Sequence, residues 1–474
     1  MSAPPSTSAA ATVTPAFADA VRAVVGADFV REDADSRLTY GTDALLRGQP
    51  ADLVVLPANT AEIARIMTLC AEHRVPLVPR GAGTGYTGGA VPLRGGVVLS
   101  LERLNRILEI DEANLLAVVQ PNVITGELQE AVEHVGLFYP PDPASLSRSS
   151  IGGNVAECAG GPRAFKYGTT KRYVIGLEAV LPTGEIVRTG GKTVKNVVGY
   201  DLTQLLVGSE GTLAIVTEVI LRLIPKPPAR AALRATFVSV ADAVAAVAGI
   251  VSARVVPATI ELVDAVSLQA LAGYLKSTSA LAPPGTEALL IVEVDGVDAA
   301  VRQEITQVAQ ACREARATDV RQAATEDERL EIWRERRELS YALRTLADIK
   351  FNHDVVVPKG RIPQLFTLIE HLRRKYDLLI PAFGHAGDGN IHVNVMVNRA
   401  DEARLARVPA AERELFEGVV ALEGSISGEH GIGFSKAPYM PLELSAETIA
   451  LMRRVKAAFD PHGILNPGKM FLQS

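Results

Sequence analysis

Apolar positions recur along the chain in helical and strand-like patterns, and these patterns predict its opening unit. In residues 60–73 an apolar side chain returns every three or four positions, the spacing of one helix face, with Thr60 as the expected cap. Short unbroken apolar runs at Leu53–Leu56 and residues 75–79 flank this segment. Because such runs suit strands buried on both faces, the chain opens with a β-α-β unit.

The pattern changes near residue 229. Before it, residues 16–25 read as a helix, Gly176–Val180 and Glu185–Thr189 as a hairpin, and Ile215–Ile224 as a strand that several prolines end. After it, helices and strands alternate, which is typical of an α+β domain with an antiparallel sheet. The expected helices are 238–251, 299–315, 446–459 and much of the charged segment 318–346, and the expected strands are 288–294 and 355–357.

A glycine-rich segment, Val75–Gly96, follows the second apolar run. Five glycines fall between Gly81 and Gly89, with Arg80 at the edge, and successive bare amides in such a loop make a concave cage for phosphate oxygens. Three of these glycines fit the G-x-G-x-x-G pattern, which marks a Rossmann fold only where a helix follows. Here Pro92 and further glycines follow instead. The sequence therefore predicts a strand–loop–strand phosphate cage, with a ligand-free surface hairpin as the alternative.

A second segment, Tyr139–Gly168, is poor in large apolar residues and rich in glycine, serine and proline. We expect a long loop here, and a loop of this length inside a compact protein is usually functional or disordered. Its glycine pairs, Gly152–Gly153 and Gly160–Gly161, predict that the backbone closely approaches a bulky ligand.

Composition excludes several classes of protein. The 474-residue chain has a formal net charge of −6 and no long basic run, which argues against nucleic acid as a main partner. Its three cysteines are widely spaced, so the sequence indicates neither a disulfide framework nor a C-x-x-C metal site. No stretch approaches the roughly 18 apolar residues of a membrane span, and residues 1–15 resemble a disordered tail rather than a signal peptide. We therefore expect a cytoplasmic protein that reaches a membrane only through a partner.

Candidate chemistry gathers in the last quarter of the chain. A glycine-rich turn at Gly384–Asn390 leads into a predicted strand, Ile391–Val397. On a strand alternate residues share a face, so the polar and apolar residues of this strand should face opposite sides. The residues of its polar face are His392, Asn394 and Met396.

Three groups near this strand suit a metal ion. His385 lies across the turn from His392, and Glu429 stands beside His430 in another glycine-flanked turn. Two histidines and a carboxylate can hold a divalent cation such as Zn²⁺, Mn²⁺ or Fe²⁺ and leave positions open for substrate. The plainer alternative is that each histidine satisfies a buried polar group.

Six motifs in order give the chain a family resemblance from about residue 50 to its end. It resembles the vanillyl-alcohol oxidase/p-cresol methylhydroxylase superfamily of FAD-binding proteins. Within that superfamily it is similar to the branch that contains D-lactate dehydrogenases, D-2-hydroxyglutarate dehydrogenases and the FAD-binding subunit of glycolate oxidase. The motifs are PRGAGTGYTGG (79–89), SIGGNVAECAGG (150–161), VGSEGTLAIVTEV (207–219), FGHAGDGNIHVNV (383–395), GEHGIG (428–433) and NPGK (466–469).

The resemblance implies an α+β fold in three parts. Residues 16–228 would form an FAD-binding domain of the p-cresol methylhydroxylase type, built from two α/β halves. Residues 229–420 would form an α+β cap of antiparallel sheet and helices, and residues 421–474 would return to the FAD domain.

The resemblance also implies non-covalent FAD, because Thr84 stands where some relatives attach the flavin through a histidine. The pyrophosphate would lie against Arg80–Gly85 and Gly152–Asn154. The expected FAD-binding residues are Pro79, Arg80, Gly81, Ala82, Gly83, Thr84, Gly85, Gly88, Gly89, Pro141, Asp142, Ser150, Gly152, Gly153, Asn154, Ala156, Gly160, Gly161, Tyr167, Gly168, Glu210, Gly211, Ile215, Val216 and Asn466.

The implied reaction is the oxidation of a 2-hydroxy acid, in which the hydroxyl loses a proton and the α-hydrogen passes to flavin N5 as hydride. An aliphatic alcohol is a poor acid, and a coordinated cation lowers its pKa, which gives a reason for a metal on His385, His392 and Glu429. By resemblance His430 is the base, since an imidazole titrates near neutral pH.

The substrate carboxylate needs a cationic partner, and arginine recognises carboxylates with two hydrogen bonds. By resemblance this residue is Arg336, and Asn394 and His430 also contact the substrate. Other arginines nearby are alternatives for the same role. They are Arg334, Arg337 and Arg344.

One departure from the family pattern bears on the substrate. Relatives that oxidise hydroxyglutarate carry a lysine shortly before a D-x-x-x-P motif, where it binds a second carboxylate. This chain has Asn352 there, with Lys350 two residues away. We therefore expect a monocarboxylate, glycolate or D-lactate, and keep D-2-hydroxyglutarate as the alternative.

The electron acceptor is not encoded in the chain, which has neither a cysteine cluster for iron and sulfur nor a C-x-x-C-H haem motif. Relatives use an iron–sulfur partner subunit, an electron-transferring flavoprotein, a quinone or cytochrome c, and we expect oxygen to be a slow acceptor. A homodimer is compatible with the sequence. Two other functions stay open: a metal-dependent hydrolase or lyase, and a non-catalytic flavin-binding subunit.

Overall fold

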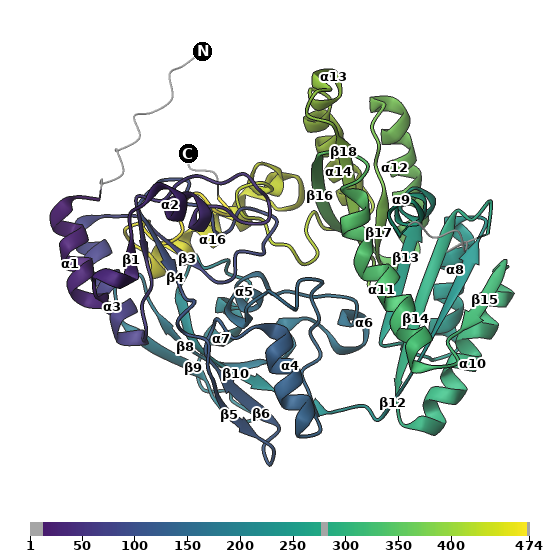
Figure 1. Ribbon diagram of the computed structural model, residues 1–474, viewed down its shortest axis with the longest axis horizontal. Helices are drawn as coiled ribbons and strands as arrows, with labels where there is room; N and C mark the ends of the chain where they lie inside the picture. Colours follow the sequence, from purple (N-terminus) through teal and green to yellow (C-terminus); the bar gives the residue numbers. More distant parts are fainter. Residues whose placement is uncertain (1–12, 276–282, 472–474) are drawn as a thin grey trace.

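The computed structural model describes residues 13–275 and 283–471. The chain forms two lobes, with the N-terminal half in one and most of the C-terminal half in the other (Figure 1). The predicted tail over 1–15 lies largely outside the described residues, and its last residue already opens the first helix. None of the described helices is long and apolar enough to cross a membrane.

The first part of the N-terminal lobe is a four-stranded sheet in the order β1-β2-β4-β3, parallel except for β1. The predicted β-α-β unit is confirmed, and the apolar positions of its helix are buried against the sheet. Asn59, rather than the predicted Thr60, caps that helix. The elements are α1 (Pro15–Val25), β1 (Val30–Arg31), α2 (Ala34–Tyr40), β2 (Leu53–Val55), α3 (Thr60–His73), β3 (Leu77–Arg80) and β4 (Val97–Ser100).

The second part of this lobe is a five-stranded antiparallel sheet in the order β5-β6-β10-β8-β9. The predicted hairpin is confirmed as the pair β8 and β9. The elements are β5 (Ile107–Asp111), β6 (Leu116–Val119), α4 (Thr125–His134), β7 (Leu137–Phe138), α5 (Ile151–Glu157), α6 (Ala164–Tyr167), β8 (Val174–Val180), β9 (Ile186–Gly190), α7 (Leu202–Leu206), β10 (Ile215–Arg222) and β11 (Ile224–Pro225).

The expectation of an uninterrupted loop over Tyr139–Gly168 was wrong, because two short helices, α5 and α6, lie inside it. Glycine disfavours helices, yet Ser150 caps α5 and accepts a hydrogen bond from the N–H of Gly153. Ile151 and Val155 are fully buried in the core of the second sheet. Burial of these two side chains therefore outweighs the low helix propensity of the segment.

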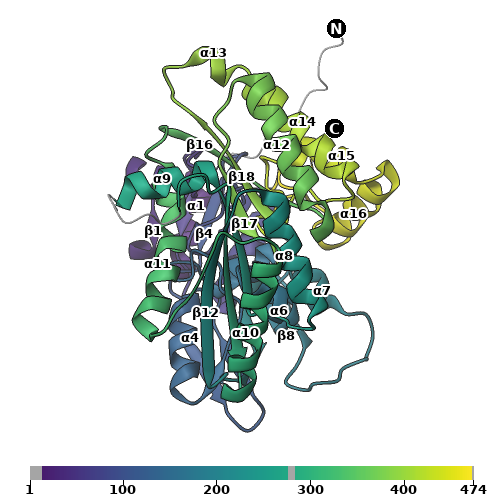
Figure 2. The ribbon, with the colours of Figure 1, turned by 90° about the vertical axis from the view of Figure 1, so that its right-hand side faces the viewer.

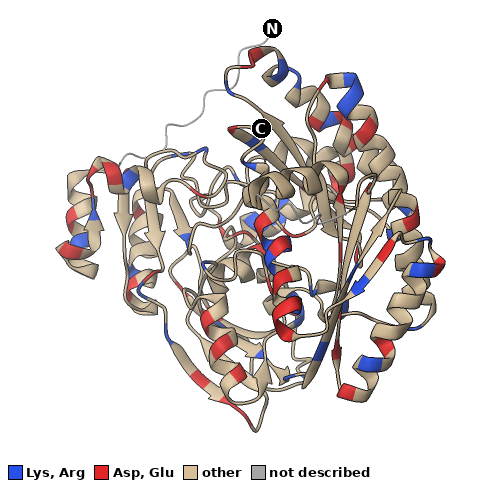
Figure 3. Cartoon of the chain, turned by 45° about the vertical axis from the view of Figure 1, so that its right-hand side comes forward, with Lys and Arg blue, Asp and Glu red and all other residues tan. Residues whose placement is uncertain are grey.

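The other lobe, the cap, is built on a seven-stranded sheet in the order β15-β12-β14-β13-β17-β18-β16, and all its pairs are antiparallel, as predicted. Helices α8, α10, α12 and α14 pack on one face and α9 and α11 on the other (Figure 2). Both signs of charge are interspersed over the helices seen in Figure 3. The strands are β12 (Ala229–Phe237), β13 (Thr259–Asp264), β14 (Ala288–Gly296), β15 (Asp319–Gln322), β16 (Ile349–Val356), β17 (Ala382–His385) and β18 (Asn390–Val397). The helices are α8 (Val240–Ser252), α9 (Ala265–Leu275), α10 (Asp298–Glu314), α11 (Glu326–Leu343), α12 (Ile362–Tyr376), α13 (Glu402–Leu405) and α14 (Val408–Ala421).

The last part of the chain runs back from the cap to the first lobe (Figure 1). Its short helix α15 (Met440–Glu443) and longer helix α16 (Ala446–Phe459) precede a loop that reaches the first sheet. There Leu465 forms a parallel bridge with Leu77, and the N–H of Asn466 donates to the Leu77 carbonyl at 2.7 Å. The domain limits at 228 and 420 stay a prediction, although the cap sheet does begin at Ala229.

Candidate active site

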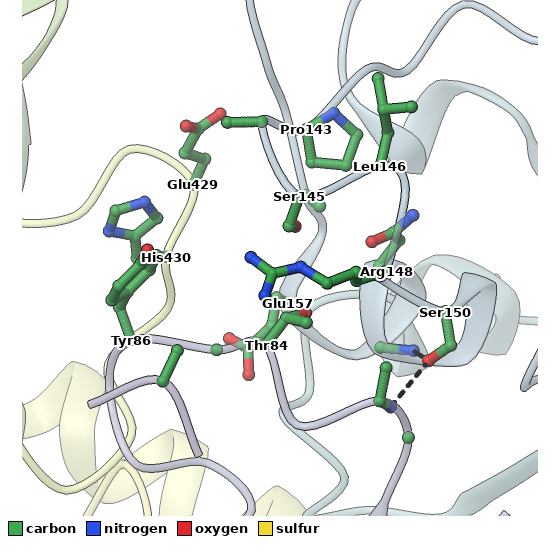
Figure 4. A pocket seen from close by; sticks show the side chains of 18 of the residues that line it. Thr84, Tyr86, Pro143, Ser145, Leu146, Arg148, Ser150, Glu157, Glu429 and His430 are labelled. Atoms are coloured by element: carbon green, nitrogen blue, oxygen red, sulfur yellow. Dashed lines mark hydrogen bonds between the residues drawn. The ribbon is translucent and has the colours of Figure 1, made fainter. Parts of the chain in front are cut away.

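A cavity of about 1490 Å³ is lined by residues of both lobes. The two glycine-rich segments contribute one wall, and α11 with the adjacent face of the cap sheet contributes the other. Figure 4 shows Thr84 and Tyr86 of the first segment, Ser150 of the second, and Glu429 and His430 around this space. The cavity thus brings together parts of the chain that are far apart in sequence.

Most of the expected FAD-binding residues line this cavity. They are Pro79, Arg80, Gly81, Ala82, Gly83, Thr84, Gly85, Gly89, Asp142, Ser150, Gly152, Gly153, Asn154, Ala156, Gly160, Glu210, Gly211, Ile215, Val216 and Asn466. The others are not among the lining residues: Gly88, Pro141, Gly161, Tyr167 and Gly168. Gly88 faces the ring of Phe434, and the Tyr167 hydroxyl donates to Asp295 at 2.7 Å, so these two contact neighbouring protein instead.

Ser150 joins the two glycine-rich segments into one cradle. Its Oγ accepts hydrogen bonds from the N–H of Ala82 at 3.3 Å and from the N–H of Gly153 at 3.4 Å (Figure 4). A Cβ on Gly81 would lie 2.4 Å from the same oxygen, so a side chain at this position would displace the hydroxyl that joins the two segments. Bare backbone from both segments therefore faces the cavity, which suits the diphosphate of FAD.

Arg80 serves the cradle in a different way from the one expected. Its Nη1 donates to the carbonyls of Tyr40 at 3.1 Å and Thr42 at 2.8 Å. Gly83 has a φ of +68°, and a Cβ there would lie 2.2 Å from the guanidinium. Arg80 thus holds residues 40–42 against the glycine loop, and the expected contact of this loop with a phosphate stays a prediction.

Thr84, the residue from which the sequence predicts a non-covalent flavin, lines the cavity. A threonine hydroxyl forms no covalent bond to the flavin ring, so acid precipitation of the purified protein should release all of its flavin. Absorbance of the supernatant measures this. Yellow colour or flavin fluorescence retained in the denatured pellet would contradict it.

His385, His392 and Glu429 converge as predicted. The Nε2 atoms of both histidines lie 3.6 Å from Glu429 Oε1, and all three ligand atoms lie within 4.8 Å of one another. Zinc–nitrogen and zinc–oxygen bonds measure about 2.0–2.2 Å, so one cation fits between atoms spaced in this way. His385 Nε2 is buried and has no hydrogen-bond partner, which a metal ion would supply.

Glu261, which the sequence reasoning missed, orients the first of these ligands. Its carboxylate is fully buried on β13 and accepts from His385 Nδ1 at 2.6 Å and from Arg336 Nε at 2.6 Å. Burial alone would raise the pKa of Glu261, but the charges of Arg336 and His385 outweigh it and lower the pKa. A proton on Nδ1 leaves Nε2 as the metal-binding atom, the usual way in which an outer carboxylate fixes a histidine ligand.

Asp354, also missed, holds the turn that carries Glu429 and His430. It is fully buried on β16 and accepts from the N–H groups of Gly428 at 2.9 Å, Glu429 at 3.2 Å and His430 at 2.8 Å. Lys436 Nζ lies 3.4 Å from its Oδ2. Burial would raise the pKa of Asp354, but Lys436 and the histidines outweigh it and hold the pKa well below its usual range. The carboxylate therefore stays ionised and fixes the turn.

His430 stands between the metal candidates and the glycine loop. Its ring stacks on His392 with centroids 5.3 Å apart and lies 5.3 Å from the ring of Tyr86. Its Nδ1 lies 3.7 Å from Asp354 Oδ2. Burial lowers the pKa of His430, against the opposing charges of Asp354 and Glu429. The imidazole is thus favoured in its neutral form, which a proton acceptor requires.

The residues expected to bind substrate occupy different environments. Arg336 lines the cavity, but its Nε and Nη2 both lie 2.6 Å from Glu261. Asn394 is fully buried, does not line the cavity, and accepts from Asn352 Nδ2 at 2.7 Å. Asn352 lines the cavity, and its buried Oδ1 has no hydrogen-bond partner. The Nζ of Lys350 donates to the Ser340 hydroxyl at 2.8 Å.

The alternative arginines differ in whether they line the cavity. Arg337 and Arg344 line the cavity, whereas Arg334 is exposed and pairs with Glu331 at 2.6 Å. Of the four candidate arginines, Arg336, Arg337 and Arg344 therefore line the cavity, where their positive charge would attract an anionic substrate.

Comparisons with known proteins support an FAD-dependent oxidoreductase. The description "FAD linked oxidases, C-terminal domain" matches residues 226–470, and "FAD binding domain" matches residues 51–190. Glycolate oxidase subunit GlcD of Bacillus subtilis is 46% identical over 436 residues, which are 92% of this chain and 92% of the relative. A D-lactate dehydrogenase of Anaerostipes hadrus is 36% identical over 95% of this chain and 94% of its own length.

The fold also has a counterpart among solved structures. A crystal structure of p-cresol methylhydroxylase with substrate bound matches with a TM-score of 0.82 over 97% of this chain and 96% of that chain. The sequence identity is 18%, so this likeness concerns the fold alone. It confirms the predicted fold class of a two-part FAD-binding domain with an α+β cap.

Proposed function

The chain belongs to the FAD-linked oxidases, and from this premise we propose that it oxidises a small 2-hydroxy acid, glycolate or D-lactate, to the 2-oxo acid. The proposal draws on relatives that are named as a glycolate oxidase subunit and a D-lactate dehydrogenase. Neither the match nor the fold favours the alternative of a metal-dependent hydrolase or lyase.

One observation carries the proposal: His385 Nε2, His392 Nε2 and Glu429 Oε1 converge next to His430 in the cavity that the glycine-rich cradle also lines. These three atoms would hold a divalent cation, and such a cation lowers the pKa of a coordinated hydroxyl. FAD bound by the cradle supplies the hydride acceptor. Side chains of this protein would bind the substrate and accept its hydroxyl proton.

His430 would take the proton of the substrate hydroxyl. Its Nδ1 faces Asp354 at 3.7 Å, so the acceptor is Nε2 on the opposite side of the ring. The stacked His392 ring and the Asp354 contacts to the backbone hold this imidazole in place. Asp354 also stabilises the imidazolium that forms, because it remains ionised beside it.

The number of carboxylates on the substrate is inferred from Lys350 and Asn352, which lie on one face of β16. Asn352 lines the cavity, whereas Lys350 is not among the lining residues and its amine donates to the Ser340 hydroxyl at 2.8 Å. No free ammonium of this strand therefore lines the cavity in the described chain to bind a second carboxylate. This arrangement favours a monocarboxylate over D-2-hydroxyglutarate, and Arg336, Arg337 and Arg344 are the candidate partners of the single carboxylate.

The proposed acceptor of the electrons is a non-oxygen one, such as an iron–sulfur partner subunit, an electron-transferring flavoprotein, a quinone or cytochrome c. The name of the relative as a subunit supports a partner protein among these.

An anaerobic titration of the purified protein tests the reaction, the substrate and the metal together. Glycolate or D-lactate should bleach the flavin absorbance, whereas L-lactate should not, and D-2-hydroxyglutarate should act with lower efficiency. Chelation should abolish bleaching and added Zn²⁺ or Mn²⁺ should restore it, because the cation activates the hydroxyl. Flavin that no 2-hydroxy acid bleaches would leave the fold intact and refute the reaction, and bleaching that survives complete metal removal would refute the metal.

A further inference from the structure

A loop between β9 and α7 exposes large apolar side chains to solvent. Val194, Val197, Val198 and Tyr200 are 86%, 95%, 92% and 94% exposed. The next apolar residues, Leu202 and Leu205 of α7, are also exposed. Figure 2 shows this segment as an open loop that extends beyond α7. We call residues 193–200 the apolar loop.

The apolar loop is not held by the rest of the described chain. The hydrogen bonds found for its described residues are local, from the N–H of Val198 to Asn196 Oδ1 at 3.2 Å and from the N–H of Leu202 to the Tyr200 carbonyl. A Cβ on Gly199 would meet nothing within 4 Å. Four large apolar side chains are thus exposed to water, and no hydrogen bond found ties their loop to any described part of the chain beyond the adjoining Leu202.

Cations stand at the base of this apolar tip. Lys192 precedes the loop, but Glu109 neutralises its charge at 2.5 Å. Lys195 lies within the loop and is in none of the ion pairs found among the described residues. Asp201, just after the loop, is engaged as the cap of α7. An apolar tip that carries Lys195 and has Tyr200 at its edge is complementary to an anionic lipid surface, where a lysine contacts headgroups and a tyrosine prefers the interface.

We propose that the apolar loop inserts Val194, Val197, Val198 and Tyr200 into the headgroup region of an anionic lipid bilayer, and so binds the protein directly to a membrane surface. A standard protein interface buries about 800 Å² on each partner. The apolar loop presents four large apolar side chains over a span of seven residues, and a fluid bilayer can take up such a small tip without a complementary preformed surface. The observations therefore favour lipid over a protein partner, independently of the proposed reaction.

Co-sedimentation of the FAD-loaded full-length protein with lipid vesicles tests this proposal. The protein should bind vesicles of phosphatidylcholine with phosphatidylglycerol more tightly than vesicles of phosphatidylcholine alone, and added salt should weaken the binding. The double variant V197D/V198D should lower the affinity for the anionic vesicles by about tenfold or more, because two apolar side chains leave the lipid and two like charges replace them.

The matched control is the double variant V256D/V297D. It makes the same change at two other exposed valines, which lie in the cap, and gives the same net charge. This control should bind the vesicles like the unaltered protein. In addition, anionic vesicles should shift the tryptophan emission of a Y200W variant to shorter wavelength. This shift should exceed that of the unaltered protein, whose single tryptophan is Trp333.

Both doubly substituted proteins should still reduce flavin with glycolate or D-lactate at the unaltered rate, since none of these valines lines the cavity. Failure of that reaction would therefore concern the proposed function and not the loop. An unaltered protein that ignores anionic vesicles would overturn the lipid proposal. So would vesicle binding that V256D/V297D weakens as much as V197D/V198D does. Absence of vesicle binding together with a dimer or hetero-complex that only V197D/V198D disrupts would assign the loop to a protein partner instead.

Discussion

A protein in which His430 is replaced by glutamine should bind FAD normally but reduce it with glycolate or D-lactate about 10²–10⁴-fold more slowly. Glutamine fills a similar volume against His392 and Tyr86, but its amide cannot accept the hydroxyl proton near neutral pH. The loss should appear in the rate constant of anaerobic flavin reduction, measured by stopped flow at saturating substrate. Flavin content and metal content should stay at the unaltered level, because His430 is not one of the three proposed ligands.

The same substitution at His353 provides the control. His353 is also buried and lies on β16, but it faces the opposite side of the sheet, where its Nε2 lies 3.1 Å from Glu412. The variant H353Q should reduce flavin at the unaltered rate. A rate in H430Q within a few-fold of the unaltered protein would place the base elsewhere, and equal losses in both variants would show that buried histidines act only on stability.

The pattern of apolar residues in the sequence predicted those elements whose structure depends on neighbouring residues. The apolar face of α3 and the two faces of β18 followed from sequence, because a surface helix buries one regular set of side chains and alternate residues of a strand face opposite sides. The helix α5 was not predicted, because its two glycines disfavour a helix. Its stability comes from the burial of Ile151 and Val155 in a core whose other residues are far away in sequence. Tertiary burial of this kind is not visible in a window of one sequence.

The candidate site was predictable where its residues stand in short glycine-flanked motifs, as His385 and Glu429 do. Glu261 and Asp354 were missed because each lies within a strand, outside the glycine-flanked motifs, and its partners are far away in sequence. A signal was nevertheless present. An acidic residue in the middle of a fully buried strand such as Thr259–Asp264 needs a cationic or polar partner, so its position alone marks a polar network. Arg336 illustrates the same limit, since its pairing with Glu261 depends on the fold.

Replacing Glu261 by glutamine should weaken the proposed metal site without touching its three ligands. The amide can accept one hydrogen bond, but it no longer balances the charges of Arg336 and His385, and it no longer selects the tautomer that leaves His385 Nε2 free. Loss of such an outer carboxylate lowers metal affinity by about 10–100-fold. The uncompensated buried Arg336 should also destabilise the protein by about 3–5 kcal/mol. Metal titration of the dialysed holoenzyme and thermal unfolding measure the two effects.

The variant E335Q separates these two effects. Glu335 lies on α11 next to Arg336 in sequence and pairs with Arg234 at 3.5 Å, away from His385. The E335Q protein should be less stable than the unaltered protein but should keep its metal affinity and its rate of flavin reduction. Excess Zn²⁺ or Mn²⁺ should restore part of the rate in E261Q, because the ligands themselves remain. If E261Q instead loses stability while its metal affinity is unchanged, Glu261 only pairs with Arg336, and the orientation of His385 must come from the strand β17 on which it lies.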